Sequence, residues 1–369
     1  MSRQKINKPV FIDLFAGAGG LSVGLEQAGF KLIAATDWDH WSCETLRANH
    51  KDTVVQEADI TKIDLKDFSR QIGRKTVDLI VGGPPCQGFS QLGKRMKDDP
   101  RNQLWREYMR FVAFFKPKLF LMENVPQLLA SDEYESIKEV AKGLGYEVRE
   151  KVLHAVEYGV PQKRRRAIIL GSKVGAPKHP RPTHANPDQF NLLNGHLKSW
   201  TTVKDAIGDL PLEPTGKDWH IGRNPTPTSL KRYKSIPPGG NRFNLPPELT
   251  PACWKRKKTG STDVFGRLEW DAPSLTIRTE FFKPEKGRYL HPQAHRPITI
   301  REAARLQTFP DTYVFIGANV QAAKQIGNAV PCRLAYAVGK ELLQLLNPPA
   351  DSVKDETVDR LAPLQSQLA

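Results

Sequence analysis

The sequence predicts an α/β protein with a parallel sheet, helices on both faces, and a second, smaller, loop-rich domain. Through residues 1–171, short apolar runs with strand character alternate with helical periodicity, which is the pattern of βαβ units. From about Ser172 prolines become frequent, helical periodicity fades and basic clusters appear among turn residues. A chain of 369 residues is long enough for two such domains.

The order of elements follows from these patterns. Strands are expected at 9–15, 31–36, 77–82, 118–125, 147–153 and 166–171, with a short strand ending at 59–60, and helices after the glycines at 17–20 and at 41–49, 104–115 and 136–144. Periodicity returns at 299–308 and in a long amphipathic helix at 330–346, which is expected to dock on the first domain. We therefore expect a first domain at 1–171, a second at 172–285, a segment at 286–346 that completes the first, and a flexible tail at 347–369.

Charge indicates the class of partner. The formal net charge is +15, and positions 173–285 hold 18 Lys and Arg against 11 Asp and Glu, which favours a polyanion such as nucleic acid. No apolar run approaches the ~20 residues of a membrane helix, and the N-terminus lacks a signal-peptide core, so a cytoplasmic protein without a membrane partner is expected. The four cysteines form no Cys-x-x-Cys pair, which disfavours a zinc site or a disulfide framework, and no metal is expected.

Cys86 follows an apolar strand that runs into two glycines and two prolines. This places a thiol at the carboxyl end of a buried strand, the edge where open α/β sheets carry their chemistry. A lone cysteine is often only a small buried hydrophobe, and on this segment alone the two interpretations are evenly matched. With no cysteine partner in the sequence pattern, Cys86 is free to react.

The glycines after the first strand indicate a cofactor site. Gly17, Gly19 and Gly20 form a strand-to-helix turn, and Asp37 ends the second strand, where a carboxylate can accept hydrogen bonds from two ribose hydroxyls. The spacing departs from Gly-x-Gly-x-x-Gly, so a nucleoside without pyrophosphate fits better than a dinucleotide.

Two further residues extend this prediction. Trp38 is suited to stack on a purine, and Asp59 to accept a hydrogen bond from an exocyclic amine. Each has a structural alternative, Trp38 as core filling and Asp59 as a helix cap.

Glu123 ends another strand of the same sheet, on the same edge as Cys86. A carboxyl group beside an apolar strand is partly desolvated and holds its proton more tightly than in water, so Glu123 is a candidate acid. In the extended segment that follows, alternation sends Gln162, Arg164 and Arg166 to one face and the intervening basic residues to the other. This segment is either a solvated basic run or a set of guanidinium groups for phosphate and carbonyl oxygens, and an ion pair with Glu123 is compatible with both.

Taken in order, these segments resemble the motifs of the bacterial DNA (cytosine-5)-methyltransferase family. The resemblance covers nearly all of positions 10–346. Its motifs are the cofactor loop at 11–20, Gly-Pro-Pro-Cys-Gln at 83–87, Glu-Asn-Val at 123–125, Gln-x-Arg-x-Arg at 162–166, the segment 301–310 and Gly-Asn-Ala-Val at 327–330. A chance match to all of them in order is negligible.

The resemblance implies a Rossmann-like, S-adenosylmethionine-dependent methyltransferase sheet with a target-recognition domain at 172–285. It implies that Cys86 attacks carbon-6 of a flipped cytosine, that Glu123 protonates or hydrogen-bonds ring nitrogen 3, and that Arg164 and Arg166 hold the cytosine carbonyl and a phosphate. The residues implied for S-adenosylmethionine, besides the three glycines, are Phe15, Asp37, Trp38, Asp59, Ile60, Leu104, Asn328 and Val330.

The resemblance further implies a monomer that acts on duplex DNA and protects it from a functionally paired restriction endonuclease. The loop at 91–102 is expected to close over the flipped base, or else to be an ordinary solvated loop. Two alternatives stay open. A tRNA cytosine methyltransferase shares the catalytic set but usually has a small recognition segment, and a DNA-binding module without turnover has no need of a nucleophile, an acid and a guanidinium group together.

Overall fold

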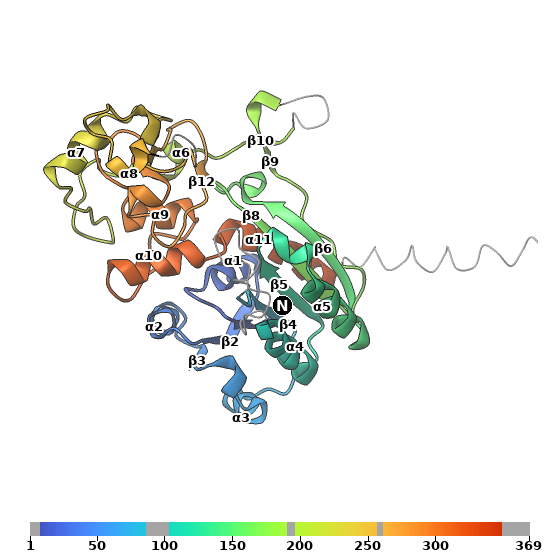
Figure 1. Cartoon of the computed structure of the whole chain (residues 1–369). Coiled ribbons are helices and arrows are strands. Elements are labelled where there is room, and N and C mark those ends of the chain that lie inside the picture. Colours follow the sequence, from blue (N-terminus) through green and yellow to red (C-terminus); the bar gives the residue numbers. More distant parts are fainter. Residues whose placement is uncertain (1–7, 86–102, 190–195, 257–260, 349–369) are drawn as a thin grey trace, which may run out of the picture.

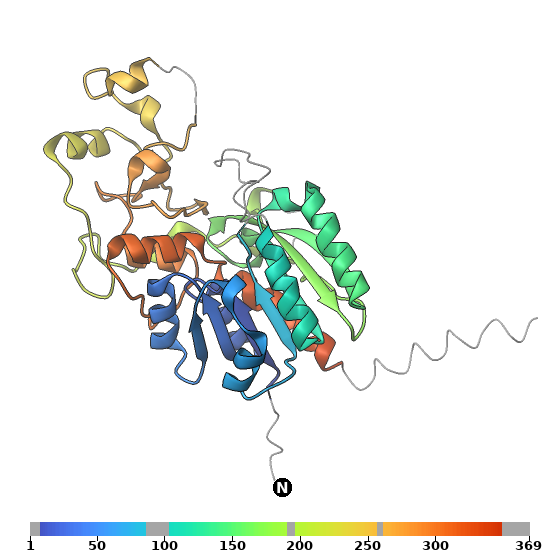
Figure 2. The same ribbon diagram turned by 60° about the horizontal axis from the view of Figure 1, so that its bottom comes forward.

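The structure, a computed structural model, describes residues 8–85, 103–189, 196–256 and 261–348. It consists of a large lobe built on one sheet and a smaller lobe at the upper left of Figure 1 that contains α7 and α8. Figure 2 shows the two lobes from below, with the strands of the sheet only in the large one. None of the described helices is long and apolar enough to cross a bilayer.

The sheet has seven strands in the order β3-β2-β1-β4-β5-β8-β6. The strands are β1 (Val10–Leu14), β2 (Lys31–Asp37), β3 (Val54–Glu57), β4 (Leu79–Gly82), β5 (Leu119–Asn124), β6 (Glu147–His154) and β8 (Arg165–Ser172). The first five are parallel, but β8 is antiparallel to both β5 and β6. The expected parallel sheet is therefore confirmed for β1 to β5, whereas β8 departs from it.

The reason lies in the connection between β6 and β8. It contains only the 3-10 turn η5 (Ala155–Tyr158) and the two-residue strand β7 (Gln162–Lys163). A parallel pairing needs a crossover of a dozen or more residues, usually a helix, so these two strands pair antiparallel. The start of β8 consequently lies at the same edge of the sheet as the ends of the parallel strands.

Helices cover both faces of the sheet, as predicted. The helices of the large lobe are α1 (Gly20–Ala28), α2 (His40–Asn49), α3 (Leu65–Gln71), α4 (Leu104–Phe115), α5 (Asp132–Gly143) and α11 (Cys332–Leu346). The alternation along β5 explains the two layers. Leu119 and Leu121 pack in the cluster that includes residues of α1 and α11, and Phe120 and Met122 pack in the cluster that includes residues of α4 and α5. Helix α11, which begins at Cys332 after the N-cap Pro331, packs against the sheet of the large lobe.

A third apolar cluster lies between the lobes. It joins Ala18 and Val23 of the large lobe to α6 (Val203–Ile207), α9 (Ile300–Leu306) and α10 (Asn319–Asn328), and it includes Ile277 and Phe281. Helix α10 was not expected, because two of its four apolar residues are alanines and give little periodic contrast. The short strand β12 (Ser274–Leu275) pairs with β7 and attaches this segment to the large lobe.

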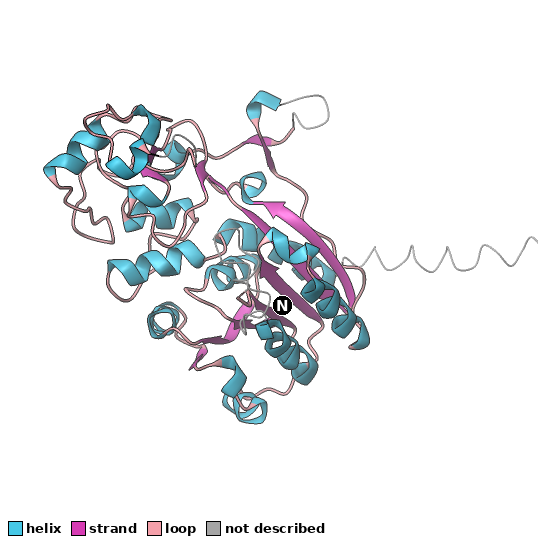
Figure 3. Ribbon diagram, in the orientation of Figure 1, coloured by secondary structure: helices cyan, strands magenta, loops and turns pink. Residues whose placement is uncertain are grey.

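The small lobe has a core of five buried residues, which are Tyr233, Ile236, Leu245, Phe265 and Leu290. Its elements are short: α7 (Pro227–Lys234), α8 (Ala252–Lys255), β11 (Gly266–Arg267) and β13 (Arg288–Leu290). Strands β9 (His184–Ala185) and β10 (Lys198–Ser199) form a separate two-stranded pair. Figure 3 shows that loops predominate in the small lobe, in agreement with the loop-rich segment expected from the sequence.

Candidate active site

One edge of the sheet carries most of the predicted site residues. The parallel strands β1 to β5 end there, β8 begins there, and the strand order reverses between β1 and β4. Open α/β sheets bind ligands in the crevice outside such a reversal, because the connections on either side lead to opposite faces.

The three predicted glycines differ in their surroundings. A Cβ on Gly20 would lie 2.3 Å from the Val330 carbonyl oxygen, and one on Gly19 would lie 2.8 Å from the Tyr313 hydroxyl, so protein atoms already occupy these spaces. Gly17 adopts φ +54° and has no described atom within 4 Å of the position of a Cβ. Gly17 is therefore the glycine whose free side faces open space, as a bound ligand requires.

Asp37 and Trp38 lie next to this turn. The Gly17 amide donates to Asp37 Oδ2 at 2.8 Å, and the Asp39 amide donates to Oδ1 at 2.9 Å. Burial raises the pKa of Asp37, and these amide hydrogen bonds oppose that effect. Trp38 is 73% exposed, with the Lys324 ammonium 5.6 Å from its ring centroid. The alternative of Trp38 as core filling is wrong, because most of its indole is free.

Asp59 lies beyond β3, which ends at Glu57, rather than at a strand end. Its Oδ1 accepts a hydrogen bond from the Thr61 amide and caps the short helix η1 (Ile60–Lys62), so the structural alternative for Asp59 is confirmed. Arg110 of α4 holds this turn through hydrogen bonds to the carbonyl oxygens of Ile60 (2.7 Å) and Ile63 (3.1 Å). Asp59 itself is exposed.

The remaining predicted cofactor residues fall into two groups. Phe15, Ile60 and Leu104 belong to one apolar cluster beside the sheet edge. Asn328, at the end of α10, is exposed, and Val330 lies against Gly20. The sheet edge therefore gathers residues that are more than 300 positions apart in the chain.

The segment after β4 is held tightly against β5. A Cβ on Gly83 would lie 2.8 Å from Glu123 Oε2, so a larger residue here would displace this carboxylate. Asn124 Nδ2 donates to the Pro84 carbonyl oxygen at 2.9 Å. Cys86 and the loop at 91–102 lie outside the described residues, whereas the chain leading into Cys86 is described as far as Pro85.

Glu123 and Arg166 form an ion pair at this edge, with Arg166 Nε 2.6 Å from Glu123 Oε1. The antiparallel register brings them together, because Glu123 of β5 pairs with Ile168 of β8, two residues beyond Arg166. Both side chains are partly accessible, at 13% and 16%. The predicted alternation also holds, since Gln162 and Arg164 are buried while Lys163 and Arg165 are exposed.

Arg164 does not reach the open edge. Its side chain is 1% exposed, and Nη1 and Nη2 donate to the carbonyl oxygens of Ile277 and Gly327, both at 3.1 Å. The Arg164 guanidinium therefore lies inside the protein, between backbone segments.

Two polar residues near the glycine turn were not predicted. Asp13 is fully buried in β1, its Oδ2 accepts a hydrogen bond from the Ser22 hydroxyl at 2.6 Å, and Oδ1 has no hydrogen-bond partner among the described residues. Burial raises the pKa of Asp13 to about 7. The Tyr313 hydroxyl donates a hydrogen bond to the Ala18 carbonyl oxygen at 2.7 Å, which holds the glycine turn in place. An acidic residue inside an apolar run was a signal for Asp13, whereas nothing local in the sequence marks Tyr313.

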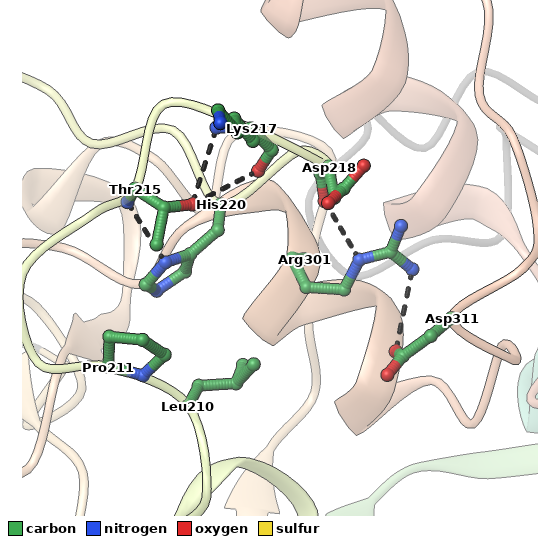
Figure 4. A pocket seen from close by; sticks show the side chains of 8 residues that line it. All are labelled: Leu210, Pro211, Thr215, Lys217, Asp218, His220, Arg301 and Asp311. Carbon is green, nitrogen blue, oxygen red and sulfur yellow. Dashed lines mark hydrogen bonds and ion pairs between the residues drawn. The ribbon is translucent and has the colours of Figure 1, made fainter.

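Other polar clusters lie elsewhere. A cavity of about 290 Å³ is lined by residues of the segment after α6 and by Arg301 and Asp311, and none of the predicted site residues lines it. Figure 4 shows Arg301 between Asp218 and Asp311 at this cavity. Among the described residues, His40, Glu44 and Glu57 have metal-ligand spacing, but Arg47 already pairs with both carboxylates.

The chain is similar to known methyltransferases over almost its whole length. The family described as C-5 cytosine-specific DNA methylase matches residues 10–344. The type II methyltransferase M1.HphI of Haemophilus parahaemolyticus is 35% identical over 346 residues, covering 91% of this chain and 87% of that protein. The type II methyltransferase M.Eco47II of Escherichia coli is 37% identical over 353 residues, covering 93% and 81%.

Solved structures give the same fold. A candidate DNA modification methyltransferase encoded within an Escherichia coli prophage aligns with a TM-score of 0.69 at 27% identity, covering 92% of this chain and 100% of that one. The Dnmt2 methyltransferase of S. pombe aligns with a TM-score of 0.63 at 19% identity, covering 92% and 100%. With the family match over residues 10–344 and the relatives above 30% identity, this chain belongs to the C-5 cytosine-specific DNA methylase family.

Proposed function

We propose that this protein, a DNA (cytosine-5)-methyltransferase of the type II restriction-modification kind, methylates one cytosine of a defined duplex sequence through a covalent adduct at Cys86. The observation that carries the proposal is the Glu123 and Arg166 ion pair, held beside Gly83 at the edge where the chain leads into Cys86. An acid and a guanidinium group next to a nucleophile loop are what the addition to cytosine requires.

The family implies S-adenosylmethionine as methyl donor, and the residues of the sheet edge fit it. The open side of Gly17, the free indole of Trp38 and the Asp37 carboxylate support a nucleoside at this end of the site. Each Asp37 oxygen accepts one amide hydrogen bond and retains a lone pair for a ribose hydroxyl. When bound, S-adenosylmethionine supplies an electrophilic methyl group on a sulfonium. The apolar residues Phe15, Ile60 and Leu104 would flank the adenine, and Asn328 and Val330 would close the site behind the glycine turn.

The target cytosine must leave the duplex stack, which costs a few kcal/mol that pocket contacts offset. Cys86 adds its thiolate to carbon-6, and Glu123 donates a proton or hydrogen bond to ring nitrogen 3, so that carbon-5 becomes nucleophilic. After carbon-5 has gained the methyl group, a base removes its proton, the bond to Cys86 breaks and 5-methylcytosine is released. Arg166 holds Glu123 through Oε1 and keeps guanidinium donors for the cytosine carbonyl.

Sequence selectivity is assigned to the segment 172–285, because loops with a surplus of cations position a duplex while their side chains contact base edges. The protein would act as a monomer on DNA in the cytoplasm and protect that DNA from a paired endonuclease.

Bisulfite sequencing tests this function directly. DNA from a host that expresses the protein should carry 5-methylcytosine in one short motif, and DNA from a host that expresses Cys86→Ser should carry none. Bisulfite sequencing of tRNA from the same cells is the parallel measurement, and it should show no new 5-methylcytosine. Methylated tRNA with unmethylated DNA would replace this proposal by the tRNA alternative.

A chimaera then tests recognition. Replacing positions 172–285 with the equivalent region of a relative should transfer the methylated motif and leave the chemistry intact. A chimaera that still methylates the original motif would place recognition elsewhere.

A further inference from the structure

A buried polar cluster, formed by Gln162, Arg164 and Gln307, lies where the two lobes meet. All three side chains are almost fully buried. Burying a guanidinium and two amides costs free energy unless their hydrogen bonds are made, so their partners reveal what the cluster holds.

Gln162 joins β7 to the segment that leads to the small lobe. Its Oε1 accepts a hydrogen bond from the Ile277 amide at 2.9 Å, and its Nε2 donates to Gln307 Oε1 at 2.9 Å. Gln307, which follows α9, donates in turn to the Ile326 carbonyl oxygen of α10 at 2.7 Å. Two amides thus connect the end of α10 to residue 277.

Arg164 makes the same connection with one group. Its two terminal nitrogens donate to the carbonyl oxygens of Ile277 and Gly327, and Nε has no partner among the described residues. Burial lowers the pKa of Arg164. A planar guanidinium has a fixed fork geometry, so one of its hydrogen bonds cannot be re-aimed without disturbing the other.

The two carbonyl groups belong to the segments that lead toward the small lobe and toward the candidate cofactor residue Asn328. Ile277 directly follows β12 and Thr276 in the segment that connects the small lobe to the large one. Gly327 precedes Asn328, a candidate cofactor residue, and a Cβ on Gly327 would lie 2.4 Å from the Thr279 amide nitrogen. The two segments therefore pack closely against each other and also share hydrogen bonds with Arg164.

We propose that Arg164 is a positioning residue that couples DNA binding to S-adenosylmethionine binding by holding Ile277 and Gly327 in one arrangement. The inference rests on the proposed function, because it takes the small lobe as the DNA-binding side and Asn328 as part of the cofactor site. When DNA fixes the segment of Ile277, or S-adenosylmethionine fixes the segment of Gly327, the Arg164 guanidinium favours the bound arrangement of the other segment. The coupling is reciprocal, since each ligand must change the affinity of the other by the same factor.

The test measures the dissociation constant of S-adenosylhomocysteine by calorimetry, with and without a saturating duplex that carries the motif found by bisulfite sequencing. The native protein should bind S-adenosylhomocysteine more tightly with DNA present, by a factor of about 5 to 150, the usual range of coupling between sites. In Arg164→Lys this factor should fall to within about twofold of one, because an ammonium is a point donor without the fork. Arg165→Lys, the same change at the exposed neighbour, should keep the native factor.

Gln307→Met keeps a side chain of similar volume but removes the amide hydrogen bonds, so it should also lower the factor. This variant replaces Arg164→Lys in the test if the Arg164→Lys protein does not fold. A native factor near one, or an Arg164→Lys protein with the native factor, would overturn the inference. A variant that binds each ligand more weakly but keeps the native factor between the dissociation constants with and without DNA would overturn it too. That result is expected of a residue with a merely structural role. A failure of the proposed function is distinct, since the native protein would then bind no S-adenosylhomocysteine or methylate no DNA.

Discussion

The two lobes are stabilised by different chemistry. The sheet of the large lobe lies between two extensive apolar clusters, whereas the core of the small lobe consists of five buried apolar residues with Trp254 and Val264 packed against it. Inside the small lobe, a buried arginine adds polar contacts to this small core. Arg267 is 2% exposed and donates to the carbonyl oxygens of Tyr233, Ile236, His291 and Ala294, at distances of 2.5 to 2.9 Å.

This difference explains how a loop-rich lobe keeps one shape. Loops leave carbonyl oxygens without ladder partners, and a guanidinium with five donors can satisfy several of them at once. Arg288 does the same nearby, with hydrogen bonds to the carbonyl oxygens of Gly239, Gly240 and Thr262. The loops of this lobe are thus supported by polar contacts to the backbone, which constrain side chains less than a packed core does.

The largest expected effect is on the small lobe. Arg267→Met should abolish measurable DNA binding, because several buried carbonyl groups lose their donor at ~1–3 kcal/mol each. Binding of S-adenosylhomocysteine should stay within about twofold, since the sheet edge is untouched. Fluorescence anisotropy with labelled duplex and calorimetry measure the two affinities. Glu248→Gln, at an exposed carboxylate of the same lobe, is the control and should keep both affinities. Equal loss of both affinities in Arg267→Met would show that the lobes are not independent.

The next effect belongs to the large lobe alone. Glu123→Gln should lower kcat by about 10² to 10⁴, the usual contribution of a positioned acid, while both ligands bind nearly as before. Single-turnover methylation with tritiated cofactor measures the rate. Glu139→Gln, an exposed residue of α5, serves as control. A Glu123→Gln rate within tenfold of the native one would remove Glu123 from the chemistry.

A pH dependence should also come from the large lobe. Burial raises the pKa of Asp13 from 3.8 to about 7, so between these values the folded protein holds a proton that the unfolded chain has released. The contribution of Asp13 to stability therefore falls as pH rises through this window, by about 4 kcal/mol in all, and is constant above it. Asp13→Asn should flatten the unfolding free energy between pH 4 and 7, measured by urea titration. An unchanged slope would contradict the burial argument.

The smallest effect concerns the cofactor. Trp38→Ala should weaken S-adenosylhomocysteine binding by about tenfold, consistent with ~1–3 kcal/mol for a base stacked on an aromatic ring, and should leave DNA affinity unchanged. Trp41→Ala, on the next helix, is the matched control. Unaltered cofactor affinity in Trp38→Ala would remove Trp38 from the site.

The contrast between the two lobes also explains how much of the fold could be predicted from the sequence. Helix α4 has the predicted bounds, 104–115, and β5 lies within its predicted range, because buried apolar periodicity is a local signal. The antiparallel β8 was missed, since strand direction depends on how short the preceding connection is. In the small lobe, the buried role of Arg267 was not predicted, because a basic residue in a loop carries no local sign of four carbonyl partners.

The candidate site divides in the same way. Glu123, Asp37 and Trp38 were identified from their positions at strand ends, which local sequence reveals. Arg164 and Arg166 were grouped by alternation, and both do lie on one face, yet their surroundings differ because the segment 274–279 covers only Arg164. Such covering by a segment more than a hundred residues away is a tertiary property that no local pattern contains.

Covalent trapping tests the central claim, that Cys86 is the nucleophile. A duplex with 5-fluorocytosine at the target should accept the methyl group but cannot lose fluorine, so a protein-DNA adduct should survive denaturing electrophoresis and require S-adenosylmethionine. The same adduct should form in three control variants, Cys43→Ser, Cys253→Ser and Cys332→Ser. Burial raises the pKa of Cys43 to about 12 and also raises the pKa of Cys332, so neither thiol ionises readily. Cys253 is exposed on the small lobe. Cys86→Ser should form no adduct, because a hydroxyl is a far poorer nucleophile than a thiolate. An adduct that persists in Cys86→Ser would contradict the account.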